Sequence, residues 1–152
     1  MQSLNLPQFH PKVFEREGKR FVFDPLRGKN VTLTPEEWVR QHFVNYLLTE
    51  KGYPQSLLAN EVSVALGQLS RRCDTVVYDA CLTPLAIAEY KAPSVAVTQK
   101  VFEQIARYNL SLRVKCLMVS NGLAHYCCRI DYRQTSYAYL KEIPSYEELK
   151  TL

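Results

Sequence analysis

Two adjacent apolar segments of this chain carry acids and a lysine at a spacing that suits catalysis. Asp74 lies in the first segment, and the second ends with Glu89, Tyr90 and Lys91. If the segments pair as an antiparallel hairpin around a turn at 79–84, with paired residue numbers adding up to about 163, Asp74 faces Glu89. Because strand side chains alternate, Glu89 and Lys91 project to one face and Tyr90 to the other. Two carboxylates and one ammonium are therefore expected to converge.

This arrangement is typical of metal-dependent phosphodiester hydrolysis. Two opposed carboxylates repel each other unless a cation lies between them. Mg²⁺ binds oxygen ligands and retains several waters, so Asp74, Glu89 and the main-chain carbonyl of Tyr90 would suffice as protein ligands. The Lys91 ammonium would orient the nucleophile, share its proton or stabilise developing charge. The alternative is that a strand ending in Glu-x-Lys simply emerges into solvent.

A second polar pair lies on a helix expected from Gln99 to about Leu110. Gln104 and Tyr108 are four residues apart and therefore share one helix face, which is otherwise apolar. In one interpretation both side chains reach the acids, where Gln104 binds a phosphate or a carboxylate and Tyr108 contacts the nucleic-acid backbone. In the other, Tyr108 packs in the core and Gln104 satisfies a main-chain group.

Further acids and arginines are accessory candidates with ordinary explanations. Glu36 and Glu37 begin a helix, where capping and the helix dipole explain both. Glu61 lies on the strand next to Asp74 and suits either the site or the exposed face of an edge strand. Arg71 and Arg72 precede Asp74 and suit either phosphate contacts or solvated positions.

The elements that must position these residues follow a clear order. Thr34, Pro35 and Glu37 mark the start of a helix that runs to about Glu50. Strands are expected at 60–66, 73–78, 85–91, 114–120, 124–131 and 137–140, with the second helix at 99–110, a hairpin at 13–24 and a helical turn after Ser145. A three-strand meander followed by a crossover helix predicts an α/β (α+β) fold with a central mixed sheet and helices on both faces.

Length and composition indicate one domain with a weak preference for anions. The 152 residues suit a single unit, with residues 1–30 as an N-terminal extension and 34–140 as the core. The net charge of +4 favours anionic partners. Five cysteines without a CxxC pair argue against a zinc site, and the absence of a signal peptide or a spanning apolar run predicts a cytoplasmic protein without a membrane partner. No Walker loop, GxGxxG or HExxH motif is present.

The ordered motifs resemble a known nuclease family. Asp74 followed by Glu89-Tyr90-Lys91 resembles the D…ExK signature of the PD-(D/E)xK nucleases. The segments 71–78, 89–93, 104–109 and 120–122 resemble the N-terminal nuclease domain of type I restriction enzyme R subunits, over roughly residues 36–131. The resemblance implies a restriction-endonuclease-like core and assigns the Q-x-x-x-Y motif to Gln104 and Tyr108. It does not extend to the ATP-driven translocase of those subunits, and Tyr90 replaces the more usual cysteine, small or aliphatic residue.

The resemblance implies a Mg²⁺-dependent DNA endonuclease or nuclease module, with Mn²⁺ as a substitute metal. Its expected partners are DNA and separately encoded restriction-modification or helicase proteins. An alternative function is a catalytically inactive nucleic-acid-binding or assembly module of the same fold. A third is an enzyme that acts on RNA or a nucleotide with the same metal chemistry.

Overall fold

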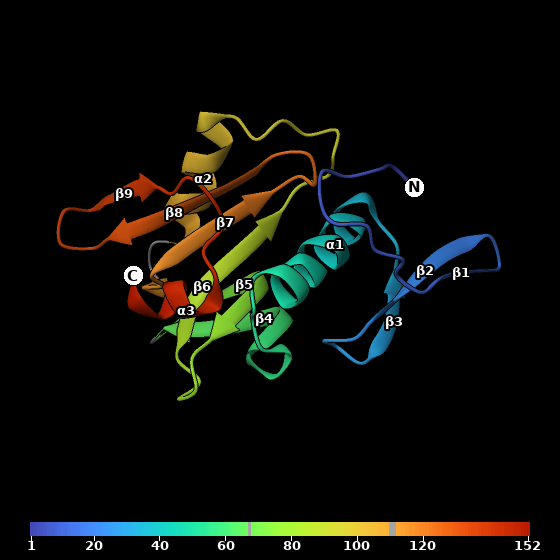
Figure 1. The fold of residues 1–152 in the computed structure, drawn as a ribbon, viewed down its shortest axis with the longest axis horizontal. Coiled ribbons are helices and arrows are strands. Elements are labelled where there is room, and N and C mark those ends of the chain that lie inside the picture. Colours follow the sequence, from blue (N-terminus) through green and yellow to red (C-terminus); the bar gives the residue numbers. More distant parts are fainter. Residues whose placement is uncertain (67, 110–111) are drawn as a thin grey trace.

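A six-stranded sheet and a smaller N-terminal sheet form the framework of the molecule (Figure 1). The computed structural model describes residues 1–66, 68–109 and 112–152, apart from the side chains of Ala65, Leu66, Leu69, Arg71 and Tyr108. The elements are β1 (Val13–Arg16), β2 (Lys19–Asp24), β3 (Lys29–Thr32), α1 (Pro35–Glu50), the 3₁₀ turn η1 (Gln55–Leu57), β4 (Leu58–Leu66), β5 (Leu69–Tyr78), β6 (Pro84–Tyr90), α2 (Gln99–Asn109), β7 (Cys116–Ser120), β8 (His125–Asp131), β9 (Ser136–Tyr139) and α3 (Tyr146–Thr151).

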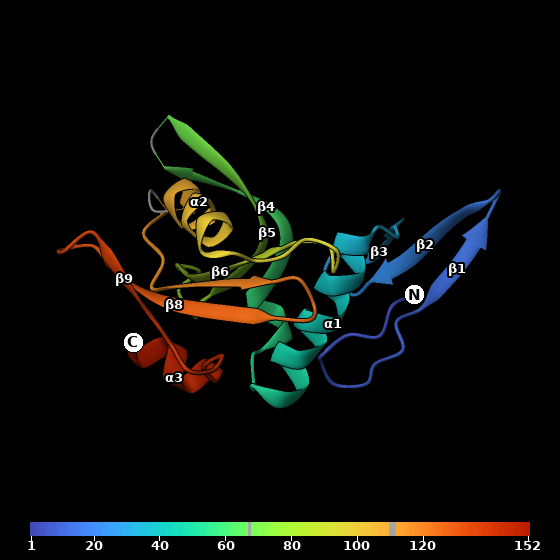
Figure 2. The ribbon, with the colours of Figure 1, turned by 90° about the horizontal axis from the view of Figure 1, so that it is seen from above.

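The central sheet is mixed, as predicted. Its strands follow the order β4-β5-β6-β7-β8-β9, and all neighbours are antiparallel except β6 and β7, which are parallel. The parallel pair is joined through α2, as a crossover between parallel strands requires. Helices α1 and α3 cover one face of the sheet and α2 covers the other (Figure 2). The predicted α/β class with helices on both faces is confirmed.

Helix α1 begins and ends where its sequence signals predicted. The Thr34 side chain accepts a hydrogen bond from the Glu37 main-chain nitrogen at 3.0 Å, and Pro35 occupies the first turn. The helix ends at Glu50, before Gly52, whose φ is +70°. A side-chain cap removes one of the unsatisfied N–H groups of the first turn, and a proline loses no hydrogen bond there. The start of the helix could therefore be predicted from its local sequence alone.

Two hydrophobic clusters lie on opposite faces of the central sheet. The α1-side cluster contains Phe43 and Leu47, together with Ala88 and Tyr90 of β6. The α2-side cluster contains Ile87 of β6 with residues of α2 and β7. Because β6 is covered on both faces, nearly all of its side chains are buried whichever way they point. Charge placed on such a strand needs a specific reason.

Strands β4 and β5 change faces part-way along their length. Leu58 and its partner Val77 pack in the α1-side cluster, whereas Val62 and its partner Cys73 contact the α2-side cluster. In a regular strand residues four apart share a face, so the pair must twist sharply between these two points. Figure 2 shows the far end of this hairpin curling beside α2.

Glu61 and Asp74 occupy the point at which the two strands change faces. Glu61 has a φ of +56°, a left-handed conformation that costs energy in a non-glycine residue. The register runs from Asn60↔Thr75 to Val62↔Cys73 without a ladder pair between Glu61 and Asp74. The distortion is thus centred on the predicted site.

The N-terminal extension forms a three-stranded antiparallel sheet. The predicted hairpin at 13–24 is confirmed as β1 and β2, with a turn in which Glu17 and Gly18 have positive φ. The third strand, β3, was not predicted, because Lys29 to Thr32 are too few and too polar to alternate clearly. Figures 1 and 2 show this sheet beyond α1, projecting away from the central sheet.

No helix in the described part of the chain is long and apolar enough to cross a membrane. No disulfide joins cysteines within that part either.

Candidate catalytic and metal-binding site

The register of β5 and β6 brings Asp74 to Glu89. The observed pairs Thr75↔Ala88, Val76↔Ile87 and Val77↔Ala86 have the predicted sum, so Asp74 and Glu89 come next along the ladder. A register shift at Tyr78 and Pro84 makes the turn shorter than predicted, since Pro84 belongs to β6. The predicted pairing of the two strands is confirmed.

A main-chain contact fixes the Asp74 carboxylate. Its Oδ2 accepts a hydrogen bond of 2.9 Å from the Tyr90 main-chain nitrogen. Asp74 is therefore held against the β6 residue that separates Glu89 from Lys91. Lys91 follows the last residue of β6 and stays paired with β7, because its main-chain nitrogen donates to the Ser120 carbonyl at 2.9 Å.

Glu89 is the electrostatically unusual residue of the pair. Burial, followed by the negative charge of Asp74, raises the pKa of Glu89 to about 9, and the Lys91 ammonium acts in the opposite direction. Its buried Oε1 has no hydrogen-bond partner among the described residues. A buried carboxylate oxygen without a donor is costly. A cation placed between the two acids would relieve both the unsatisfied oxygen and the repulsion.

A cavity of about 250 Å³ joins Glu89 to Gln104, one member of the second predicted pair. Glu89, Lys91 and Gln104 line it, together with Val101, Ile105 and Asn109. The packing of α2 thus brings Gln104 to the ExK triplet, as one of the two interpretations required. Gln104 is exposed rather than committed to a main-chain group of the core.

Asn109 is a site residue that the sequence reasoning missed. It is fully buried, its side-chain nitrogen donates to the Ile105 carbonyl at 2.9 Å, and its Oδ1 has no partner among the described residues. The two unsatisfied buried oxygens of the described chain, on Glu89 and Asn109, therefore belong to residues of one cavity. An unsatisfied acceptor suits a water or another donor in that cavity. The signal available in the sequence was a polar residue, Asn109, directly after the Q-x-x-x-Y motif.

Tyr90 points away from the acids, as alternation predicted. Its ring lies 5.7 Å from that of Phe43, and its hydroxyl donates to the Thr75 hydroxyl oxygen at 2.8 Å. Its side chain is buried on the α1 side of the sheet. Only the main chain of Tyr90 faces the site, and its carbonyl stays a predicted ligand.

The accessory acids Glu37 and Glu61 are held by arginines. Arg40 of α1 is buried and lies 2.9 Å from a carboxylate oxygen of each acid, while its Nη1 donates to the Asp74 carbonyl at 2.8 Å. Arg72 also pairs with Glu61, at 2.6 Å. Burial alone would raise the pKa of either acid, but the hydrogen bonds from these arginines hold both pKa values below the usual range.

Sequence reasoning did not single out Arg40, and the structure explains its importance. Its guanidinium joins the acid on the first helix, the strained Glu61 and the main chain of Asp74. An arginine on the buried side of a helix, one turn after Glu37, was the signal that could have found it. Glu36, in contrast, is exposed.

The same network extends to the N-terminal sheet. Arg27 donates to Asp24 and, at 2.6 Å, to Glu37. Asn60 donates to Asp24 at 3.1 Å and accepts from Thr75 at 2.7 Å. Continuous hydrogen bonds thus run from the root of the N-terminal sheet to both strands of the site.

Two predicted residues lie partly outside the described structure. Arg71 is placed in β5 and Tyr108 in α2, but their side chains are outside the described residues. The phosphate contact predicted for Arg71 and the nucleic-acid contact predicted for Tyr108 therefore stay predictions.

The donor set of the site suits a hard divalent cation. Asp74 and Glu89 supply carboxylate oxygens, the ligands that Mg²⁺ prefers. Within the described ranges, no group of three or more His, Cys, Asp or Glu side chains forms a metal-binding arrangement. A cation held here would therefore complete its shell with main-chain, water or substrate oxygens.

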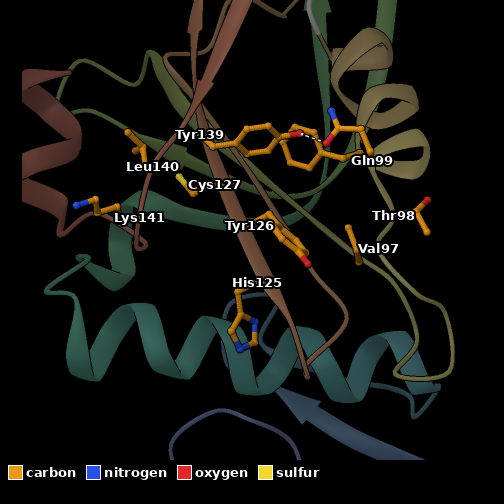
Figure 3. Close-up of a pocket in the computed structure, with 10 residues that line it drawn as sticks. Val97, Thr98, Gln99, His125, Tyr126, Cys127, Tyr139, Leu140 and Lys141 are labelled. Atoms are coloured by element: carbon orange, nitrogen blue, oxygen red, sulfur yellow. Dashed lines mark hydrogen bonds between the residues drawn. The ribbon is translucent and has the colours of Figure 1, made fainter.

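A larger cavity, of about 480 Å³, lies elsewhere, between α2 and strands β8 and β9. Tyr126 and Tyr139 line it, and the Tyr139 hydroxyl donates to Gln99 at 3.1 Å (Figure 3). This cavity contains no carboxylate, and its lining residues are not those of the predicted site.

Comparison with known proteins places the chain in a family. A family model described as "Type I restriction enzyme R protein N terminus (HSDR_N)" matches residues 35–144, a range that includes every predicted site residue. The chain belongs to this family. The match confirms the resemblance to the N-terminal domain of type I restriction enzyme R subunits. No curated protein matches the chain.

A solved structure shares the fold of this HSDR_N domain. It is a fragment assigned as an HsdR subunit of a type I restriction enzyme from Vibrio vulnificus YJ016, with a TM-score of 0.54 and 20% sequence identity. The alignment covers 78% of this chain and 25% of that one. The domain therefore spans about a quarter of the HsdR fragment, and the likeness concerns the fold.

Proposed function

We propose that this HSDR_N domain is a Mg²⁺-dependent deoxyribonuclease module that hydrolyses phosphodiester bonds. The observation that carries the proposal is the partly buried Asp74 and Glu89 pair, with a buried, unsatisfied Glu89 oxygen in a cavity shared with Lys91. Two neighbouring acids, one of them with a strongly raised pKa, and an unpaired oxygen are unfavourable in a merely structural role. They are useful where a metal binds.

Each residue has a distinct role in this proposal. Asp74, Glu89 and the Tyr90 carbonyl hold Mg²⁺, or Mn²⁺ in its place. The bound metal polarises a phosphoryl oxygen and lowers the pKa of an attacking water. Lys91 lies beside Glu89 and offers its ammonium to the nucleophile or to the charge that develops on the phosphate. Gln104 donates from the wall of the cavity to a phosphate oxygen, and Tyr108 contacts the DNA backbone.

The structure separates the accessory candidates by their partners. Glu37 and Glu61 neutralise Arg40, so their contribution is to position Asp74 rather than to bind the metal directly. Arg72 is exposed beyond its contact with Glu61 and offers its remaining donors to DNA phosphates. Glu36 has no role in the proposed reaction.

The family supports a proposal for the cellular setting. DNA is the proposed substrate, and separately encoded restriction-modification or helicase proteins are the proposed partners in the cytoplasm. A second candidate function is a catalytically inactive nucleic-acid-binding or assembly module of the same fold.

Plasmid cleavage tests the proposal directly. Supercoiled DNA is incubated with the wild-type chain and with Lys91→Ala in Mg²⁺, Mn²⁺ or EDTA, and nicked product is measured. We expect metal-dependent nicking that falls at least about 100-fold in Lys91→Ala, because general acid–base and electrostatic groups contribute factors of that size. Lys100→Ala, on the exposed side of α2, is the matched control and should retain activity.

Two results would reject nuclease activity. One is equal nicking by the wild type and Lys91→Ala, which would identify a contaminant. The other is DNA binding without cleavage in either metal, unaffected by Asp74→Asn, which would favour the binding module.

A further inference from the structure

The N-terminal sheet has one face that carries cations and aromatic rings but no acid. Its register pairs Phe14 with Phe21 and Arg16 with Lys19, and the ladder continues to Lys12 and Phe23 through a hydrogen bond of 3.0 Å. These six residues therefore share one face, together with Asn30 and Thr32 of β3. We call it the basic aromatic face.

This face is open to solvent. Lys12, Arg16 and Lys19 are exposed, and the three phenylalanines are only partly buried. The opposite face carries Val22 and Asp24, which are fully or almost fully buried against the rest of the molecule. None of the three phenylalanines belongs to either core cluster. Three aromatic rings on an open sheet face are unusual for a surface without a partner.

The cations are interleaved with the rings. Arg16 lies 6.0 Å from the Phe14 ring centroid and Lys12 lies 5.9 Å from that of Phe23. The rings of Phe14 and Phe21 stack at 5.5 Å. Residues 12–33 contain six Lys or Arg and three Asp or Glu, a net charge of +3 out of +4 for the whole chain. Most of the net positive charge of the chain therefore comes from the segment that forms the N-terminal sheet.

We propose that the basic aromatic face binds single-stranded nucleic acid. Its cations would contact phosphates, and its half-buried rings would stack on unpaired bases, a combination typical of sheet surfaces that bind single strands. Duplex DNA, with its bases already stacked, would gain only the phosphate contacts. The face lies outside residues 35–144, the range matched by the family model. Through Arg27 and Asn60 the root of the sheet is bonded to the elements that hold Asp74.

The inference rests on the proposed function only in that the bound strand would be part of the nuclease substrate. Binding is therefore measured by fluorescence anisotropy in EDTA, where no cleavage occurs, with the full chain. A labelled single strand of about 20 nucleotides and the corresponding duplex are the probes. Lys100→Ala, on the exposed side of α2, should bind as the wild type does. Because binding is measured without metal, the failure of this inference and the failure of the catalytic proposal are distinguishable.

The test variant is Arg16→Gln with Lys19→Gln. Each lost phosphate contact removes about 0.7 from the slope of log affinity against log salt on a single strand, so two contacts weaken binding about 10- to 30-fold near 0.1 M salt. The matched control is Arg20→Gln with Lys29→Gln, which removes the same charge from exposed positions on the opposite face. Phe14→Leu should weaken single-strand binding and leave duplex binding unchanged.

Three outcomes would overturn the inference. Unchanged single-strand affinity in the test variant would show that the face is not used. An equal loss in the control variant would show that only net charge matters. An equal effect of Phe14→Leu on single-strand and duplex binding would show that the rings do not stack on unpaired bases.

Discussion

Replacing Glu89 by glutamine should stabilise the metal-free protein at neutral and alkaline pH. Burial, followed by the charge of Asp74, raises the pKa of Glu89 from its ordinary 4.5 to about 9. Between these values the folded state holds a proton that the unfolded state has released. The free energy of unfolding therefore falls as pH rises through this window, and the penalty is absent below about pH 4.5. Glutamine resembles the protonated side chain and does not titrate.

The expected size follows from the width of the window. Each pH unit between the two pKa values costs up to about 1.4 kcal/mol of stability, so the limit at about pH 7.5 is close to 4 kcal/mol. The amide keeps a buried polar atom without a partner, which offsets part of the gain. We expect Glu89→Gln to raise the free energy of unfolding by about 2 to 4 kcal/mol at about pH 7.5 and by less than about 1 kcal/mol at pH 5.

Urea unfolding in EDTA, followed by circular dichroism across this pH range, measures the difference. For a chain of this size a gain of 2 kcal/mol corresponds to at least about 4 °C in Tm. Exposed Glu142→Gln is the control and should show no such trend. Added Mg²⁺ should stabilise the wild type and not Glu89→Gln. A variant no more stable than the wild type at pH 7.5, or a gain that is the same at pH 5, would refute the electrostatic reasoning.

Three further substitutions test the surroundings of the site. Arg40→Met leaves the buried Glu37 carboxylate and the half-buried Glu61 carboxylate without their shared cation, and should lower the free energy of unfolding by about 3 to 5 kcal/mol in urea titrations; a near-neutral effect would contradict the network. Tyr90→Phe loses one hydrogen bond to Thr75, and should cost about 1 kcal/mol in the same measurement while plasmid nicking is kept. A folded but inactive Tyr90→Phe would place the hydroxyl in the chemistry. Gly122→Ala puts a Cβ 2.7 Å from Leu4 at a φ of +85°, and should destabilise by about 1 to 3 kcal/mol and expose the N-terminal segment to proteolysis; unchanged proteolysis would show that the segment packs independently.

Local signals predicted most elements because each depends on neighbouring residues only. The helix start at Thr34 and the helical turn after Ser145 both appear where their sequence patterns placed them. Weak patterns failed, as the short polar strand β3 shows. Residue spacing and strand propensity could not predict β3, because its pairing with β2 depends on the β1–β2 hairpin already being formed.

The sequence by itself determined that Asp74 would face Glu89, and that Lys91 would share the face of Glu89 while Tyr90 pointed away. Strand alternation and a short turn are enough to fix those relations. Only the tertiary structure decided the rest: that α1 sends Arg40 to the Asp74 main chain, that Glu61 bends the strand there, and that α2 encloses Glu89 with Asn109. These contacts join residues far apart in sequence, so their partners are chosen by the packing of whole elements rather than by local pattern.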